Sequence, residues 1–161
     1  MEKQSGLEKL KNQYKEFQGK YGLPDFKFLN ENFEIESLAG EETELLLKKI
    51  RKQMIEKVTA GLRALEMFLN PQNTPLFIFP IIKNFSQTDK EIISQLHHEL
   101  GEFEISSFGL ENHYSEEAEA AVIKKVAEKW KDIADNFDII FKSMKVNYTK
   151  QTKKNEKSYL G

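Results

Sequence analysis

The sequence predicts an all-α fold, an antiparallel helical bundle of four main helices with an extended strap after the first helix. In the clearest helical segment, apolar side chains recur at alternating spacings of three and four, so they lie on one stripe of a helix. This stripe consists of Ile123, Val126, Trp130, Ile133, Phe137, Ile140 and Met144. Hydrophobic residues make up 39% of the 161 residues, which is enough for the core of one domain. Prolines and glycines stand between the helical segments, where they end helices.

The first helix is predicted over residues 7–21, and Gly22 followed by Pro24 ends it. The next segment, residues 25–35, carries aromatic and aliphatic side chains without a long helical repeat. We interpret it as the strap laid across the bundle, with a short helical turn capped by Asp25 and then extended chain.

The second helix is predicted from about Glu41 to Leu69, where Asn70 and Pro71 end it. Its apolar stripe faces the same core as the stripes of the later helices. Trp130 occupies a heptad position, so we expect it in this core rather than as an anchor for a partner. The predicted core includes Ile50, Met54, Leu65, Leu96, Trp130, Ile133 and Phe137.

The chain between residues 71 and 85 is the least regular part, because Pro75 and Pro80 prevent a long helix. It is also too apolar for an ordinary solvated loop. Two interpretations of this apolar run stay open. It either caps one end of the bundle, which we favour, or forms an exposed surface that binds a partner. The residues concerned are Leu76, Phe77, Ile78 and Phe79.

The third helix is predicted to begin with a capping box, whose spacing is present at Thr88–Glu91. Its helical pattern becomes weaker near Gly101 or Gly109. Ser115 is expected to cap the fourth helix, whose first-turn glutamates suit the positive end of the helix dipole. Beyond Val146 the polar, lysine-rich sequence predicts a flexible tail. The sequence therefore predicts a single helical-bundle domain over residues 1–146 and a basic tail over residues 147–161.

The net charge of -2 conceals an uneven distribution. Residues 142–161 contain six lysines and one glutamate, so this segment carries +5 and the rest of the chain carries -7. Clustered lysines can bind phosphates without reading a base sequence, although a solvated terminus that aids solubility is an equally good interpretation. The candidates for polyanion binding are Lys150, Lys153, Lys154 and Lys157.

The chain has only two arginines, Arg51 and Arg63, which makes base-specific reading of nucleic acid by its body a poor fit. The two arginines could form an anion site on the second helix. Glu44, Glu56 and Glu66 lie within reach along that helix, so surface ion pairs are the favoured interpretation.

The sequence contains none of the usual catalytic constellations. It has no glycine-rich phosphate loop, no Gly-x-Ser-x-Gly elbow, no His-Glu-x-x-His helix and no cysteine. The nearest metal candidate is His98 with Glu102, but two ligands on one helix do not make a site, so a surface pair is favoured. His97 is expected at the edge of the apolar stripe. We expect no catalytic residues, no cofactor and no metal.

We therefore expect a non-enzymatic helical interaction or scaffold protein whose partner is another protein. The alternative is a nucleic-acid- or ribosome-associated protein that contacts phosphates through its lysine-rich C-terminal tail. A third class, an enzyme or metal-binding bundle, is less favoured because the sequence offers no convergent set of histidines and carboxylates. The longest apolar run has seven residues against the roughly 20 that a membrane helix needs, so no membrane association is expected. The sequence shows no export signal and favours a cytoplasmic location. It leaves the oligomeric state open.

Overall fold

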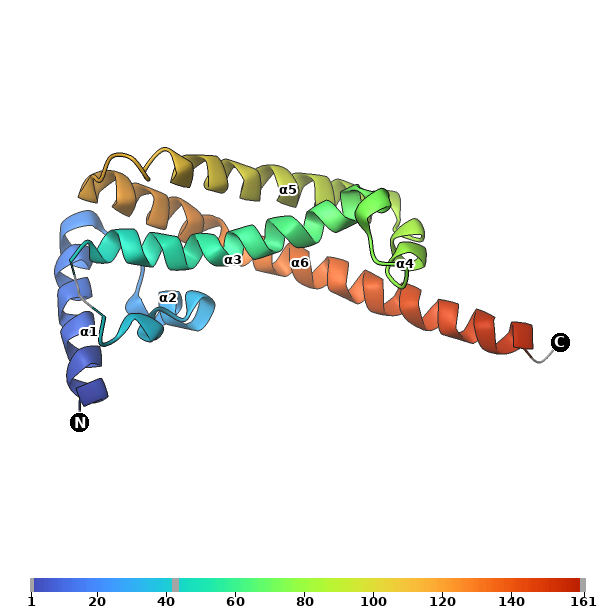
Figure 1. Ribbon diagram of the computed structural model, residues 1–161, viewed down its shortest axis with the longest axis horizontal. Coiled ribbons are helices and arrows are strands. Elements are labelled where there is room, and N and C mark those ends of the chain that lie inside the picture. Colours follow the sequence, from blue (N-terminus) through green and yellow to red (C-terminus); the bar gives the residue numbers. More distant parts are fainter. Residues whose placement is uncertain (1, 42–43, 160–161) are drawn as a thin grey trace. The chain divides into compact units, whose positions relative to one another are not determined.

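The computed structural model describes residues 2–41 and 44–159 of the chain (Figure 1). This part of the chain is helical and contains no strand, which confirms the predicted all-α class. Among the described residues, no helix combines the length and the apolar character that crossing a membrane requires. The α-helices are α1 (Glu2–Tyr21), α2 (Phe26–Phe33), α3 (Leu46–Leu69), α4 (Phe79–Lys83), α5 (Gln87–Phe108) and α6 (Glu116–Tyr159), with short 3-10 helices η1 (Ile35–Leu38) and η2 (Pro71–Asn73).

Four of these helices, α1, α3, α5 and α6, coincide with the four predicted main helices. α1 ends as predicted at Gly22, which adopts a φ of +63°, a left-handed conformation that glycine tolerates. α3 begins at Leu46 and not at the predicted Glu41. The residue directly before it, Leu45, has a φ of 56°, and a left-handed residue cannot continue a right-handed helix.

The predicted extended strap is wrong, because residues 26–33 form helix α2. Leu29 and Phe33 lie one helical turn apart on its buried face. Glu34 ends the helix with a φ of 56°, and Ile35 begins η1 as a buried residue. Phe33 and Ile35 alternate as a strand would, and this short alternation concealed the helical spacing before it.

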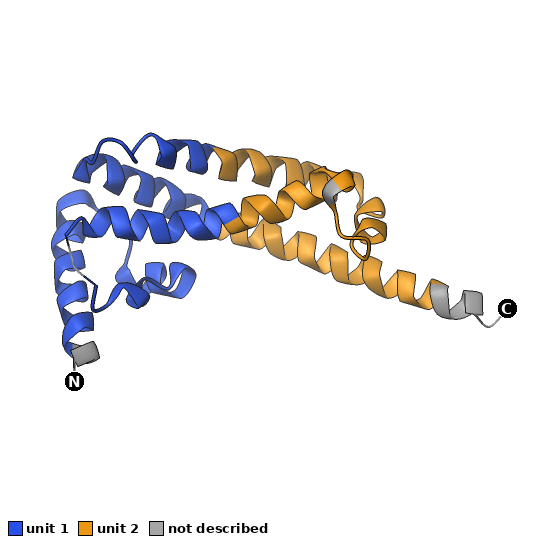
Figure 2. Ribbon diagram, in the orientation of Figure 1, with its two compact units in different colours: residues 1–59, 102–130 blue, residues 60–101, 131–161 orange. Residues whose placement is uncertain are grey.

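Two compact units divide the chain, and the long helices α3, α5 and α6 each contribute to both (Figure 2). Unit 1 comprises Met1–Thr59 and Glu102–Trp130, and unit 2 comprises Ala60–Gly101 and Lys131–Gly161. Each unit has buried apolar side chains of its own. Of the predicted core residues, Ile50, Met54 and Trp130 are buried in unit 1 and Leu65, Leu96 and Ile133 in unit 2, whereas Phe137 is half-buried.

Trp130 packs inside unit 1, which confirms its predicted place in the core. Its side chain is only 6% exposed, and its ring centroid lies 4.7 Å from that of Phe33. The ammonium group of Lys57 lies 5.8 Å from each of these two ring centroids, within the range of a cation–π interaction. The aromatic pair therefore joins α2 to the middle of α6 inside unit 1.

Arg51 is a buried cation of unit 1 and is only 1% exposed. Its Nε donates to Oε2 of Glu119 at 2.5 Å and its Nη2 donates to Oε1 at 3.3 Å, so the guanidinium binds the carboxylate with two nitrogens. Its Nη1 donates to the Ser107 hydroxyl at 2.5 Å and lies 3.0 Å from Oε1 of Glu111. Burial opposes the charge, but Glu119 and Glu111 outweigh it and raise the pKa of Arg51 above its usual value.

The expectation of surface ion pairs along one helix is therefore wrong for Arg51. Its partners come from α5, from the connection after α5 and from α6. Spacing along α3 shows which side chains share a face, but it does not show which face is covered by other helices. Arg63, in contrast, is exposed.

The capping box of α5 in unit 2 uses Ser86 and Asp89 instead of the predicted Thr88 and Glu91. The backbone N–H of Asp89 donates to Oγ of Ser86 at 3.0 Å, and the N–H of Ser86 donates to the Asp89 carboxylate at 2.8 Å. The hydroxyl of Ser143 on α6 donates to the same carboxylate at 2.8 Å. Burial opposes ionisation of Asp89, but these hydrogen bonds outweigh it and lower its pKa.

Helix α6 continues to Tyr159, so the predicted flexible tail is helical up to that residue. No proline or glycine interrupts residues 116–159, and the apolar stripe passes into a polar continuation at Asn147. Asn147 is buried in unit 2, and its Nδ2 donates to the carbonyl of Ile81 at 3.2 Å. Packing therefore extends past residue 146, while the division of the chain into a domain and a tail stays a prediction.

The position of Trp130 predicts a large loss of stability on truncation. Trp130→Ala should lower the free energy of unfolding by about 3–5 kcal/mol, because it removes a buried indole and its contact with Phe33. Phe108→Ala, at a side chain that is 64% exposed, is the control and should change it by less than about 1 kcal/mol. Chemical denaturation measures both. Equal losses in the two variants would show that Trp130 is not a core residue.

The buried ion pair of Arg51 and Glu119 predicts that replacing one partner lowers the free energy of unfolding more than replacing both. Arg51→Ala leaves the Glu119 carboxylate buried without its partner and should lower the free energy of unfolding by about 3–5 kcal/mol. Arg51→Met combined with Glu119→Leu removes both charges and should be clearly less destabilising. Denaturation midpoints compare the two. A double variant as unstable as Arg51→Ala would show that the unpaired charge is not the cause.

Candidate functional site

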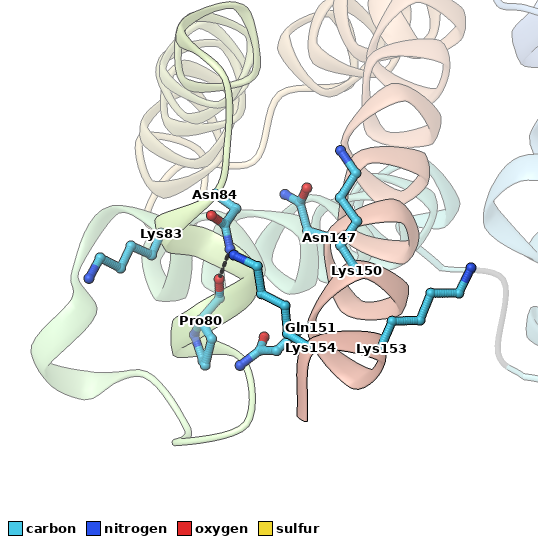
Figure 3. A pocket seen from close by; sticks show the side chains of 8 residues that line it. All are labelled: Pro80, Lys83, Asn84, Asn147, Lys150, Gln151, Lys153 and Lys154. Atoms are coloured by element: carbon cyan, nitrogen blue, oxygen red, sulfur yellow. Dashed lines mark hydrogen bonds between the residues drawn. The ribbon is translucent and has the colours of Figure 1, made fainter. Parts of the chain in front are cut away.

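A cationic hollow of about 590 Å³ lies in unit 2 between the short helix α4 and the C-terminal part of α6 (Figure 3). Its volume falls in the range of small-molecule sites. We call it the lysine pocket. It is lined by Pro80, Lys83 and Asn84 on the α4 side and by Asn147, Lys150, Gln151, Lys153 and Lys154 on the α6 side.

Local interactions fix the α4 wall of this pocket. Pro80 stands in the first turn of α4, where its missing N–H is no loss. The Nδ2 of Asn84 donates to the Pro80 carbonyl at 2.8 Å and so caps the end of the same helix. Ile81 and Ile82 are buried, and Asn147 donates to the Ile81 carbonyl from α6. The two walls are therefore joined by a buried hydrogen bond.

The electrostatics of the lysine pocket follow from its composition. Of the eight described residues that line it, four are lysines and none is acidic. No described side chain forms an ion pair with Lys83, Lys150, Lys153 or Lys154 (the side chains of residues 155–161 are not among those described). Figure 3 shows Lys83 on the α4 wall with its side chain directed away from α6, and Lys150, Lys153 and Lys154 on the α6 wall. Like charges arranged around one hollow repel one another, and an anion placed there relieves that repulsion.

The structure brings three of the four predicted polyanion residues, Lys150, Lys153 and Lys154, to this pocket. The side chain of the fourth, Lys157, lies outside the described residues. Lys83 and the α4 wall of the pocket were not predicted from the sequence. A signal was present, since the heptad positions of α6 continue through Asn147 and indicate that the helix still packs against something there.

The apolar connection before α4 divides into exposed and buried side chains. Leu76 is 91% exposed, Phe77 69% and Phe79 45%, whereas Ile78 is buried. The side chain of Ile78 is therefore buried, as a cap requires, whereas the other three side chains are exposed, as a partner-binding surface requires. Binding of a partner at these residues stays a prediction.

The histidines do not assemble a metal site in the described part of the chain. No group of three or more His, Cys, Asp or Glu side chains there could hold a metal ion. Oε2 of Glu102 lies 3.8 Å from Nζ of Lys125, and Nε2 of His97 lies 4.0 Å from Oε1 of Glu66. His98 is exposed.

Comparison with known proteins finds no matching family model, no similar curated protein and no similar solved structure.

Two neighbouring residues, the exposed Phe77 and the buried Ile78, can test which side chains of the apolar connection lie in solvent. Phe77→Ser should change the free energy of unfolding by less than about 0.5 kcal/mol, because the side chain lies mainly in solvent. Ile78→Ser should lower it by about 2–4 kcal/mol, because it places a hydroxyl in a buried apolar site. Denaturation midpoints and light scattering compare the two. If Phe77→Ser is as destabilising as Ile78→Ser, Phe77 is part of a cap and not of a free surface.

Proposed function

We propose that this chain is a non-enzymatic binding protein that holds a phosphate-bearing partner, a nucleic acid or the RNA of a ribosome, in the lysine pocket of unit 2. The observation that carries the proposal is that lysines of two helices line one hollow, and that none of the described residues lining it is acidic. Lysine ammonium groups bind phosphate as point charges and release the counterions condensed on it.

The composition of the pocket favours contact with the backbone of a nucleic acid over reading of its bases. No arginine lines the pocket, and arginine is the usual bidentate reader of guanine. Its described lining residues include no aromatic side chain either, so they offer bases no stacking platform. Binding is therefore expected to be independent of base sequence and strongly dependent on salt.

The buried charged groups support a non-enzymatic role, because neighbouring side chains already bind them. Arg51 and Glu119 satisfy each other in unit 1, and the Asp89 carboxylate is occupied by Ser86 and Ser143 in unit 2. These groups therefore stabilise packing.

A partner protein is a second candidate, supported by the exposure of Leu76, Phe77 and Phe79. Exposed aromatic and aliphatic side chains close together in the chain are typical of interaction surfaces. We also propose, from the apolar stripes of the sequence, that α1, α3, α5 and α6 form an antiparallel four-helix bundle and that the protein acts in the cytoplasm.

The proposed function predicts binding to a labelled RNA, measured by fluorescence anisotropy. The triple variant Lys150→Gln, Lys153→Gln and Lys154→Gln should bind at least about 10-fold more weakly at 50 mM salt. Its slope of log affinity against log salt should be smaller by roughly two, since each lost phosphate contact removes about 0.7–0.9.

The matched control for charge is Lys9→Gln, Lys15→Gln and Lys131→Gln, which removes three exposed lysines outside the pocket. Measured at the same 50 mM salt, it should lose clearly less affinity than the pocket variant, because none of its three lysines lines the pocket. Equal losses in the two triple variants would show that net charge binds the RNA and that the pocket does not.

A further inference from the structure

We infer that single-stranded RNA binds along an exposed face of α6, where its bases stack on the rings of Phe141 and Tyr148 and its backbone contacts Lys145. The inference rests on the proposed function and specifies the strandedness of the nucleic acid and the residues that meet its bases. Its carrying observation is that two exposed aromatic rings and a lysine share one side of the helix, which we call the aromatic face.

Helical spacing places these three residues on one face of α6. Lys145 follows Phe141 by four positions and Tyr148 follows Lys145 by three, and residues three or four apart are neighbours on a helix surface. Phe141 is 44% exposed and Tyr148 54%, and Lys145 is also exposed. Each ring directly follows a buried residue of the packed face, Ile140 or Asn147, and so projects about 100° further around the helix.

A second ring supports Phe141 from the packed side of the helix. The rings of Phe137 and Phe141 are stacked, with centroids 5.8 Å apart and an angle of 21° between their planes. Phe137 is half-buried and lies close to α3, where a Cβ atom added at Gly61 would be 3.1 Å from its Cζ. A ring that is already held in this way loses less conformational entropy when a base stacks on it.

The charge of this part of α6 is complementary to a phosphate backbone. Between Asp138 and Glu156 the helix carries five lysines and no acidic residue. All five are exposed, namely Lys142, Lys145, Lys150, Lys153 and Lys154. Figure 3 shows Lys150 and Lys153 directed away from the hollow. A strand meets cations at separate points along its length, so lysines that point to different sides suit a strand better than a compact anion.

The aromatic face and the lysine pocket lie within reach of one strand. Tyr148 directly follows Asn147, which lines the pocket. An α-helix is only about 10–12 Å across with its side chains, so a strand at the pocket reaches Tyr148 within a few nucleotides. The pocket lysines then contact phosphates, and the rings of the aromatic face contact bases.

The exposed area of the aromatic face is too small for a stable contact with another protein. A fully buried aromatic side chain covers about 150–250 Å², so two rings that are about half exposed offer roughly 200 Å². A stable protein interface takes about 800 Å² from each partner. A base needs only one ring to stack on, and such stacking accepts any base. Single-stranded RNA therefore fits this face better than a partner helix does.

The experiment compares RNA probes that differ in whether their bases are free to stack. Fluorescence anisotropy of the full chain at about 50 mM salt uses a labelled single strand of about 12 nucleotides. The second probe is the same strand with abasic residues, which keeps every phosphate, and the third is the same strand annealed to its complement. The single strand should bind at least about 5-fold more tightly than the abasic strand, because only its bases can stack on the rings.

The deciding variant is Tyr148→Leu, which removes the ring but keeps an apolar side chain that favours a helix. It should weaken binding of the single strand about 5–10-fold and leave the abasic strand and the duplex within about twofold. Tyr148→Phe keeps the ring and should stay within about twofold for all three probes. The matched control is Phe108→Leu, at an aromatic side chain of unit 1 that is 64% exposed, and it should behave like the wild type. Circular dichroism and the unfolding midpoint should be unchanged in all three variants, because the replaced side chains are exposed.

Three outcomes overturn the inference, and they differ in what they say of the proposed function. If the single and abasic strands bind equally and Tyr148→Leu weakens neither, while the triple lysine variant of α6 loses both, the protein binds phosphates alone and only the inference is wrong. If light scattering shows a dimer that Tyr148→Ser dissociates, a second copy of the chain covers the aromatic face and the inference is again wrong. If none of the three probes binds, the proposed function is wrong as well.

Discussion

The buried charge of Arg51 is the constraint on which the arrangement of unit 1 depends. A guanidinium removed from water is tolerated only when its donors are satisfied, and here they are met by Glu119, Ser107 and Glu111. These partners lie on α6, on α5 and in the connection between them, so any rearrangement that separates α3 from them exposes a lone buried charge. Such a pair adds little net stability compared with apolar packing, but it disfavours other registers of the helices.

In unit 2, too, buried polar groups are hydrogen-bonded between different elements. The Asp89 carboxylate closes the capping box of α5 and accepts a hydrogen bond from Ser143 on α6. Asn147 satisfies the carbonyl of Ile81. In both places a polar side chain of α6 adds a hydrogen bond to a group of another element that already has a local partner, Ser86 for Asp89 and the N–H of Asn84 for the Ile81 carbonyl. These contacts extend the packed face of α6 beyond its last apolar stripe residue and place α4 opposite the C-terminal lysines.

The lysine pocket is a consequence of this polar continuation. After Met144 the heptad positions of α6 carry Asn147 and Gln151, which pack less closely than large apolar side chains and leave a hollow between the helices. The four lysines that line it are exposed. A functional site formed where a packed stripe gives way to polar residues needs no catalytic motif, which is consistent with a chain that shows none.

The sequence by itself determined the features that depend on local spacing. The apolar repeats predicted the four long helices and the burial of Trp130, and Ser115 was recognised as the cap whose Oγ accepts from the N–H of Ala118. The lysine cluster was also visible, including three of the residues that line the pocket. Each of these signals lies within one helix, where a separation along the chain fixes a separation in space.

Only the tertiary structure decided which residues meet across helices. It paired Arg51 with Glu119 instead of with glutamates of its own helix, turned the predicted strap into α2, and placed Lys83 opposite the lysines of α6. Periodicity shows which side chains share a face, but it does not show what covers that face. The partner of a buried charge or the second wall of a pocket is fixed by the packing of whole helices, where tertiary contacts outweigh local preferences.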